Sequence, residues 1–398
     1  MKKQKISIYL FMGLFAFGLI TAGCSKKDDD TPTGSDIEAL ALSPEWNTYL
    51  VAATSELLDD CTALWAAWNG PTGLTDEEKA RIGNDFFTTH GDDIGTGGYA
   101  EIFKAANGDY EGLTTEIEAI QMLIEDGCIN IAGEVGEQKI GGPYDLAKSG
   151  KTDQAVLEVE SWYSWNSITD YADNITSIKN SYWGGRNLSA AHASSISAFV
   201  KSQDSDLDAA VVAAIDNARA KIQGIPAPFR NNLTADEVDE AMDACADLVE
   251  IFETEVIPLL EGTDYDFTPV LAQYADAVVV PTYRDMKNAA KTLYDNAVAY
   301  NSNPTQANLD KVCEAWRANR IPWEQSEAFL FGPADILGLD PSLDSWPLDQ
   351  NAIGEVLKSI QSGATVAQVI GKIQEDEIRG FHTIELLLFK DGANRKVK

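Results

Sequence analysis

The sequence contains little basic charge and almost no histidine. Its 398 residues include 30 lysines and arginines against 63 aspartates and glutamates, which gives a formal net charge of −33. Nucleic-acid binders gain affinity by neutralising phosphates with Lys and Arg, so this balance argues against that class of protein. It also argues against docking on anionic lipid. With 44% hydrophobic residues and nine tryptophans, the chain is nevertheless a folded body and not a disordered acidic tail.

Cysteine and histidine are too scattered to predict a zinc site. The three histidines are His90, His192 and His382, and no HExxH or CxxC spacing occurs. We expect the first two to be surface residues. Besides Cys24, four cysteines lie in helix-like apolar patterns, and they either form two disulfides or are buried free thiols. They are Cys61, Cys128, Cys245 and Cys313.

Only one long apolar run is present, from Ile6 to Ile20, and it follows three lysines. It is short for a bilayer span and precedes small residues, so residues 1–23 are predicted to be an export signal, with a membrane anchor as the alternative. Cys24 then resembles the lipidated cysteine of a bacterial lipobox. Residues 24–44 are polar and acidic and are predicted to be a flexible tether. Their Lys-then-Asp run resembles a surface-export signal of Bacteroidetes lipoproteins, or is simply a solvated linker.

Two-residue alternation typical of strands is absent, and from residue 45 onward the apolar residues recur at threes and fours. We therefore predict an all-α protein of antiparallel helical bundles joined by short polar loops. A candidate boundary lies at Gly262–Asp266. Besides a helix ending before Asn69, helical periodicity predicts helices over 75–87, 112–127, 153–182, 189–201, 205–223, 234–261, 268–301, 304–330, 349–361 and 365–389.

A histidine and a glutamate three residues apart lie in a strongly apolar segment near the C-terminus. His382 and Glu385 share one helix face and are followed by three leucines and Phe389. So apolar a helix should be buried, and both polar groups should face other protein groups. Gly380 would permit a close approach of backbone or ligand. The pair either binds a metal ion or forms a buried hydrogen bond; spacing alone favours the hydrogen bond, and a metal needs a third ligand from elsewhere.

Two more polar clusters lie in helical patterns. In the first, a carboxylate and amide stripe beside an apolar stripe suits a helix that lines a polar cleft, or a solvated face. In the second, an Arg–Glu pair among aromatic residues is typically a structural brace, and the serine lacks the GxSxG elbow of a nucleophile. The first contains Glu160, Ser161, Ser164, Asn166, Asp170 and Asn174, with Glu134 and Lys139 upstream, and the second contains Arg320, Trp323, Ser326 and Glu327.

Together, the three clusters resemble the imelysin family of bacterial exported proteins. The Gly-x-His-x-x-Glu motif of that family matches Gly380, His382 and Glu385. Its Trp-x-x-Ala-Arg…Tyr-x-x-Thr-Glu-x-Phe segment matches Trp316, Arg320, Trp323, Ser326, Glu327 and Phe329, with Asn319 where alanine is usual. Its acidic/Lys and Glu-Ser…Ser-x-Asn segments match Glu134, Lys139, Glu160, Ser161, Ser164, Asn166, Asp170 and Asn174.

The resemblance implies two similar antiparallel four-helix bundles packed side by side, with a shared cleft where the clusters converge. The order of the segments differs from the usual family order. Residues 45–261 resemble the later portion of the family domain, and residues 267–398 resemble its start. We therefore predict a circular permutation with its junction near Gly262–Asp266, which is mild where chain termini lie close together.

For function, the resemblance implies iron uptake, and the family has also been classed as metallopeptidases. One histidine among many carboxylates suits iron or another hard divalent metal better than a zinc peptidase centre. We expect a non-enzymatic outer-membrane lipoprotein, facing the periplasm or the cell surface, that binds iron, an iron chelate or an outer-membrane uptake component. The alternative is a metallopeptidase that uses His382 and Glu385. A third hypothesis is a scaffold in which these residues only brace the bundles.

Overall fold

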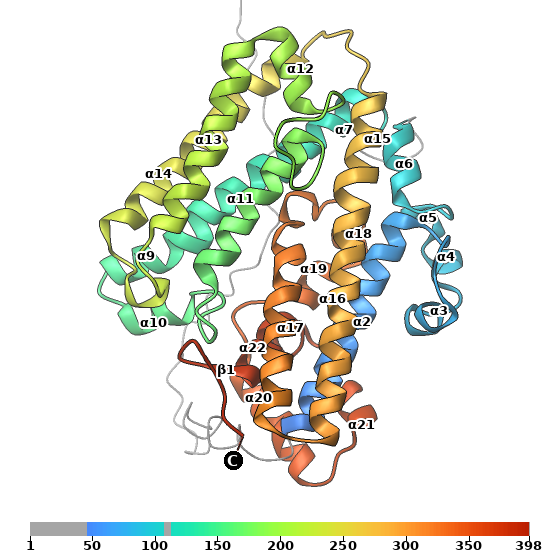
Figure 1. Cartoon of the computed structure of the whole chain (residues 1–398), viewed down its shortest axis with the longest axis vertical. Coiled ribbons are helices and arrows are strands. Elements are labelled where there is room, and N and C mark those ends of the chain that lie inside the picture. Colours follow the sequence, from blue (N-terminus) through green and yellow to red (C-terminus); the bar gives the residue numbers. More distant parts are fainter. Residues whose placement is uncertain (1–45, 107–112, 398) are drawn as a thin grey trace, which may run out of the picture.

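The computed structural model describes residues 46–106 and 113–397 (Figure 1). The predicted export signal, the lipidation site at Cys24 and the tether lie outside these residues. Nearly every described element is a helix, which confirms the all-α prediction. One short antiparallel hairpin near the C-terminus pairs β1 (Phe389–Lys390) with β2 (Ala393–Asn394).

The first bundle is built from helices at the two ends of the described chain (Figure 1). α2 (Trp46–Asn69) packs against α16 (Val280–Ser302), which packs against α17 (Gln306–Glu324), and α22 (Gly380–Leu388) closes the group. Every residue of α22 is buried, because apolar side chains surround His382 and Glu385 on the helix. Around this bundle lie α3 (Asp76–Ile82), α4 (Phe86–Thr89), α5 (Gly91–Ile94), α6 (Tyr99–Ala105), α18 (Pro333–Ile336), α19 (Leu339–Asp344), α20 (Gln350–Gln361), α21 (Val366–Ile370) and the 3₁₀ turns η7 (Glu327–Phe329) and η8 (Asp376–Ile378).

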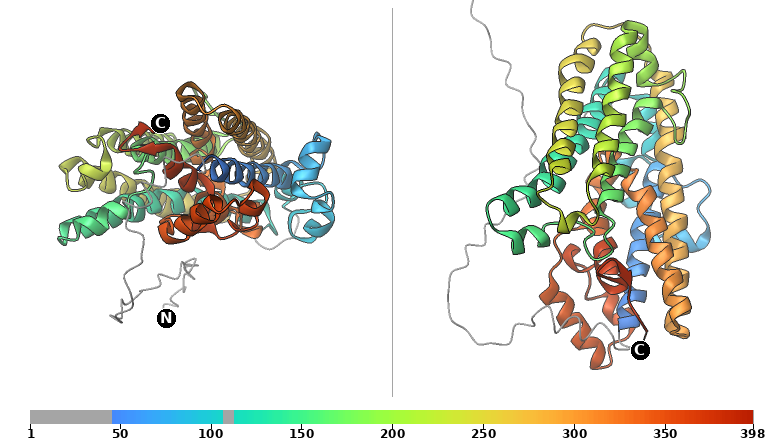
Figure 2. Two further views of the ribbon diagram at one scale, coloured as in Figure 1. Left: turned by 90° about the horizontal axis from the view of Figure 1, so that it is seen from below. Right: turned by 60° about the vertical axis from the view of Figure 1, so that its left-hand side comes forward.

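The second bundle uses the middle of the chain (Figure 2). A continuous helical run from 116 to 148 packs with α11 (Ser167–Trp183), α13 (Ser205–Gly224) and α14 (Asp236–Ile251). The run alternates α and π geometry through α7 (Glu116–Met122), η1 (Leu123–Ile129), α8 (Asn130–Gly133), η2 (Glu134–Ile140) and α9 (Gly141–Lys148). The remaining elements are α10 (Thr152–Leu157), α12 (Ile196–Gln203), η3 (Phe229–Asn231), η4 (Phe252–Val256), η5 (Ile257–Leu260), α15 (Thr268–Tyr274) and η6 (Ala275–Val279).

Helix α2 belongs in space with α16 and α17, although the loop at 262–266 separates them in sequence. The predicted chain permutation concerns family order and stays a prediction. All four described cysteines are buried free thiols, so the disulfide alternative is wrong for them. Within 46–106 and 113–397, no helix combines the length and apolarity needed to cross a bilayer.

The structure differs from the predicted helices at the elements that form the site. The single helix predicted over 365–389 is divided into α21, η8 and α22, and α19 lies where no helix was predicted. The helix predicted over 153–182 is interrupted, and residues 158–166 form a non-helical turn between α10 and α11. Ser161 and Trp165 adopt positive φ angles of 54° and 59° in this turn. Helical periodicity continues through the turn, but the backbone is diverted by tertiary hydrogen bonds, which override a weak local preference.

Candidate functional site

A fully buried arginine lies at the junction of the two bundles. Arg320 on α17 forms ion pairs with Glu324 one turn later and with Asp344 at the end of α19. Its Nη2 also lies 3.2 Å from Glu160 Oε1 and 3.2 Å from Asp170 Oδ2. Asp170 lies on α11, so this one guanidinium joins helices of both bundles. A planar guanidinium with five donors is suited to such a position, whereas lysine is not.

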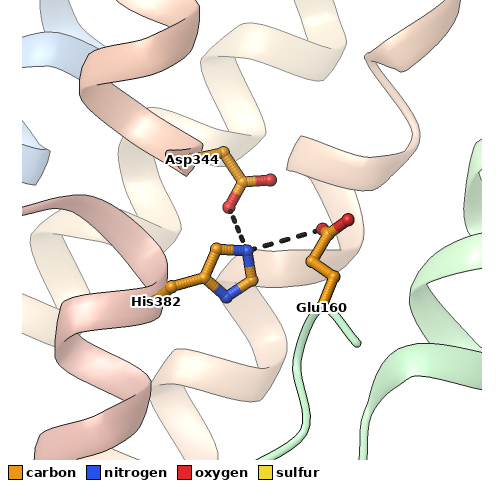
Figure 3. Close-up of side chains that lie close together, drawn as sticks. All are labelled: Glu160, Asp344 and His382. Atoms are coloured by element: carbon orange, nitrogen blue, oxygen red, sulfur yellow. Dashed lines mark ion pairs between the residues drawn. The ribbon is translucent and has the colours of Figure 1, made fainter. Parts of the chain in front are cut away.

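His382 faces the same group of carboxylates (Figure 3). Its Nε2 lies 3.1 Å from Asp344 Oδ1 and 3.5 Å from Glu160 Oε1, and its Nδ1 lies 3.1 Å from Glu385 Oε2. Among the described residues, no group makes an aligned hydrogen bond to Nε2, although the ring is completely buried. Asp344 and Glu160 therefore point at one edge of the imidazole, and Glu385 holds the other edge in place.

Gly380 explains how α19 reaches His382. It has a φ of +74°, and a Cβ placed on it would lie 2.4 Å from the carbonyl oxygen of Leu343 and 2.9 Å from that of Ser342. Only glycine permits this backbone approach. Because Asp344 follows Leu343 directly, the glycine lets the end of α19 bring its carboxylate to the histidine.

The non-helical turn over 158–166 supplies further polar groups. The backbone N–H and the hydroxyl of Ser164 donate to Glu385 Oε1 at 2.7 and 2.6 Å. The Ser161 hydroxyl and the Asn166 amide each donate to Asp170, both at 2.5 Å. The turn thus orients the two carboxylates that hold His382 and Arg320 in place.

Lys139 reaches the cluster from the π-helical segment η2. Its Nζ lies 2.8 Å from Glu160 Oε2, 3.6 Å from Glu134 Oε1 and 3.9 Å from Glu327 Oε1. Residues five apart point in well separated directions on an α-helix but lie closer in direction in π geometry, which helps to bring Glu134 and Lys139 together. Gly136 between them packs closely on Cys245, because an added Cβ would lie 2.8 Å from that residue's Cβ.

Burial and neighbouring charges set the protonation of the cluster. Burial favours neutral His382, but Asp344, Glu160 and Glu385 outweigh it and hold its pKa well above the usual value. Burial likewise opposes ionisation of Glu160 and Asp344, yet the cations around them lower the pKa of both carboxyls. Burial raises the pKa of Asp170 to about 6, against the opposing effect of Arg320.

Two other buried carboxyls behave differently. Burial raises the pKa of Glu324 and Glu327 well above the usual value, although Arg320 and Lys139 respectively oppose it. Both groups therefore give up their protons less readily than Glu160 and Asp344, which makes them weaker metal ligands than those two carboxylates.

Two sets of three residues bring ligand atoms within 4.8 Å of one another: Glu160 with Asp344 and His382, and Glu324 with Glu327 and Asp344. The first set contains ionised carboxylates and His382 Nε2, which has no aligned hydrogen bond, so it fits a cation better. The imidazolium must release its Nε2 proton when that nitrogen binds a metal. Two carboxylates and one imidazole are donors that suit iron or manganese. Glu385 contacts the ring nitrogen remote from this set, as carboxylates that orient a metal-binding histidine do.

Most of the residues predicted for the site converge, but not all. Trp323 Nε1 donates to Asp344 Oδ2 at 2.6 Å, and Asn174 donates to Glu324 Oε2 at 2.5 Å. Ser326 instead donates to the carbonyl of Trp323 at 2.6 Å, just after the end of α17, and takes no part in the cluster.

Three functional residues were not predicted. Glu324 carries a signal that could have identified it, since it lies four residues after Arg320 on one helix face. Arg317 donates to the Ser164 carbonyl at 3.0 Å and to Asn166 Oδ1 at 2.9 Å. Asp344 lies in a stretch without helical periodicity, and its role follows only from the tertiary approach of α19 at Gly380.

Several known proteins are similar to this chain. The sequence model of the family described as Imelysin matches residues 14–254 and 279–398. A crystal structure of an imelysin peptidase from Bacteroides ovatus is 38% identical, with a TM-score of 0.78 over 90% of this chain and 97% of that chain. A putative iron-regulated protein A precursor from Parabacteroides distasonis is 30% identical, with a TM-score of 0.40 over 50% of this chain and 61% of that chain.

A curated relative is named for its regulation by iron. Iron-regulated protein A of Synechococcus elongatus is 40% identical over 116 residues, which are 29% of this chain; the chain spans 30% of the length of that relative. The family match extends over most of the chain and includes all the residues of the cluster. This chain belongs to the imelysin family.

Proposed function

We propose that the protein is a non-enzymatic component of bacterial iron acquisition that binds iron as its cargo between Glu160, Asp344 and His382. The observation that supports this most directly is the convergence of three ligand atoms on one buried point, with His382 Nε2 lacking an aligned partner. The name of the relative in Synechococcus elongatus, an iron-regulated protein, agrees with this cargo.

The surroundings of the three ligands favour binding over hydrolysis. The side chains of Arg320, Glu324, His382 and Glu385 are fully buried, and Glu160 is 6% exposed. A hydrolytic metal centre needs an open coordination position, a water and space for the substrate. A buried cluster of charged side chains can hold an ion but offers a peptide no access.

The first residues support an outer-membrane location for the protein. With an export signal over 1–23 and a lipid on Cys24, the helical body would sit at the outer membrane on a tether of about twenty residues, where 3.3–3.6 Å per residue sets its reach. We infer that it faces the periplasm or the cell surface and passes iron to an outer-membrane uptake component.

Anaerobic titration of the purified protein from residue 25 onward with Fe²⁺, followed by calorimetry and elemental analysis, tests the proposal. We expect one ion per chain, and affinity at least about tenfold weaker in Glu160→Gln, Asp344→Asn and His382→Gln. His192→Gln is the matched control, because that histidine is exposed and outside the cluster. Equal binding by all four variants would place the iron elsewhere, and binding of a ferric chelate alone would make the chelate the cargo.

A further inference from the structure

The residues around the proposed iron site come from three helices and one irregular turn. Arg320, Asp344 and His382 come from α17, α19 and α22, whereas Glu160 comes from the turn over 158–166. All these groups are buried, so an ion reaches them only when part of the wall moves. Local opening occurs most readily where few regular backbone hydrogen bonds must break, which singles out the turn.

This turn holds backbone strain. Ser161 and Trp165 occupy the left-handed region, which is unfavourable for residues other than glycine. The indole of Trp165 is 43% exposed, so burial returns little of this cost. The closed form of the turn therefore depends on contacts made by other elements.

The C-terminal hairpin supplies one of these contacts. The N–H of Gly392 donates to the Tyr163 carbonyl at 2.9 Å. Gly392 also lies flat against Trp165, because a Cβ placed on it would be 2.4 Å from the indole Cδ2. The hairpin over 389–394 thus presses directly on the strained part of the turn.

Arg317 connects the turn and the hairpin. Its guanidinium donates to Ser164 and Asn166 of the turn, and its Cζ lies 4.6 Å from the ring centre of Phe389 at the start of the hairpin. One half-buried side chain therefore couples the two segments, so that lifting the hairpin weakens the hold on the turn.

We propose that residues 158–166 and 389–394 form the gate of the iron site. When the hairpin lifts from Trp165, the turn relaxes its strained backbone and carries Glu160 away from Asp344 and His382, which opens the site to the ion. Closure returns Glu160 as the last ligand. This inference depends on the proposed function for its ligand, but the opening itself is a property of the protein without iron.

Hydrogen exchange of the iron-free protein, followed by mass spectrometry, tests the opening alone. We expect peptides covering 158–166 and 389–395 to exchange together and faster than α22, whose amides lie in a buried helix. Gly392→Ala should raise exchange in both segments by about tenfold, since a shift of that size in an opening equilibrium needs only a small change in contact energy. If the turn is as protected as α22, the gate is refuted whether or not the protein binds iron.

Stopped-flow binding of Fe²⁺ under anaerobic conditions tests the gate in action. Tryptophan fluorescence is the signal, because the ring centres of Trp346 and His382 lie 4.9 Å apart. Gly392→Ala and Arg317→Met should each speed both binding and release by about tenfold and leave the dissociation constant nearly unchanged. Gly363→Ala is the matched control, because Gly363 has a φ of +97° with nothing within 4 Å.

The results separate the alternatives. A weaker affinity with unchanged binding rate would make the turn a support for Glu160 and overturn the gate. A slower rate in Glu134→Gln, with no effect of Gly392→Ala or Arg317→Met, would place the route beside the partly exposed Glu134 instead. Wild-type protein that opens in hydrogen exchange but binds no Fe²⁺ would refute the proposed cargo and leave the opening intact.

Discussion

Replacing Gly380 with alanine tests how closely α19 must approach α22. The new methyl group would lie 2.4 Å from the carbonyl oxygen of Leu343, whereas ordinary contact begins at 3.4 Å. The backbone of α19 must therefore retreat by 3.4 − 2.4 = 1.0 Å. Asp344 would move with it, away from His382 and Arg320.

Two costs add in this variant. Alanine at a φ of +74° costs about 1–2 kcal/mol, and displacing packed backbone adds about 1–3 kcal/mol. We expect Gly380→Ala to lower the free energy of unfolding by about 3 kcal/mol and to weaken Fe²⁺ binding by at least about tenfold, because one ligand is displaced.

The matched control is a glycine beside α19, the helix that Gly380 approaches. Gly338, which precedes α19, has a φ of +60° with nothing within 4 Å of its added Cβ, so Gly338→Ala has only the backbone cost. Guanidinium unfolding followed by circular dichroism gives the stability of each variant, and calorimetry gives its iron affinity. If Gly380→Ala matched Gly338→Ala in both measurements, the close approach of Leu343 would not be what positions Asp344.

Two further variants test the electrostatics. Burial raises the pKa of Asp60 to about 7 despite Arg379, 2.9 Å away, so the folded state holds this proton more tightly than the unfolded state, and the free energy of unfolding should rise as pH falls from 8 to 5.5. The Asp60 side chain is 16% exposed, and Asp60→Asn should remove about 2 kcal/mol of that rise in urea unfolding. Glu355→Gln, at an exposed position, should leave the rise unchanged. Lys139→Met should lower the free energy of unfolding by about 3 kcal/mol, because Glu160 loses the ammonium group that pairs with it. Fe²⁺ should restore part of this loss in thermal melts. The surface variant Lys291→Met should show neither effect.

The sequence predicts the helical part of this molecule well, for a physical reason. Helix α2 and the helices from 268 to 324 carry long apolar stripes, and each stripe needs a partner helix to cover it. The burial of His382 and Glu385 follows from the same reasoning, since no polar face is left on a helix that ends in three leucines. The local pattern of apolar residues is sufficient to predict a helix wherever burial of its apolar face determines the structure.

The local pattern of apolar residues fails to predict the structure where a contact between segments distant in sequence determines it. The segment over 158–166 has the spacing of a helix, but Ser164 turns its N–H and hydroxyl to Glu385, 221 residues away. Asp344 comes after Pro341 and Ser342 in a stretch with no period, and nothing nearby marks it as a ligand. Both features depend on how the bundles pack, which a single sequence does not reveal.

Bracing the bundles and binding a cation are separable roles within the cluster. Asp170 contacts Arg320 and lies outside the three-ligand set, so Asp170→Asn should lower stability by about 3 kcal/mol and leave iron affinity unchanged. His382→Gln removes the imidazole ligand, but Glu160 and Asp344 still pair with Arg320, so it should weaken iron binding at least about tenfold with a smaller loss of stability. If both variants changed stability and affinity in the same proportion, the cluster would be only a brace, because a brace has no residue that affects binding without affecting folding equally.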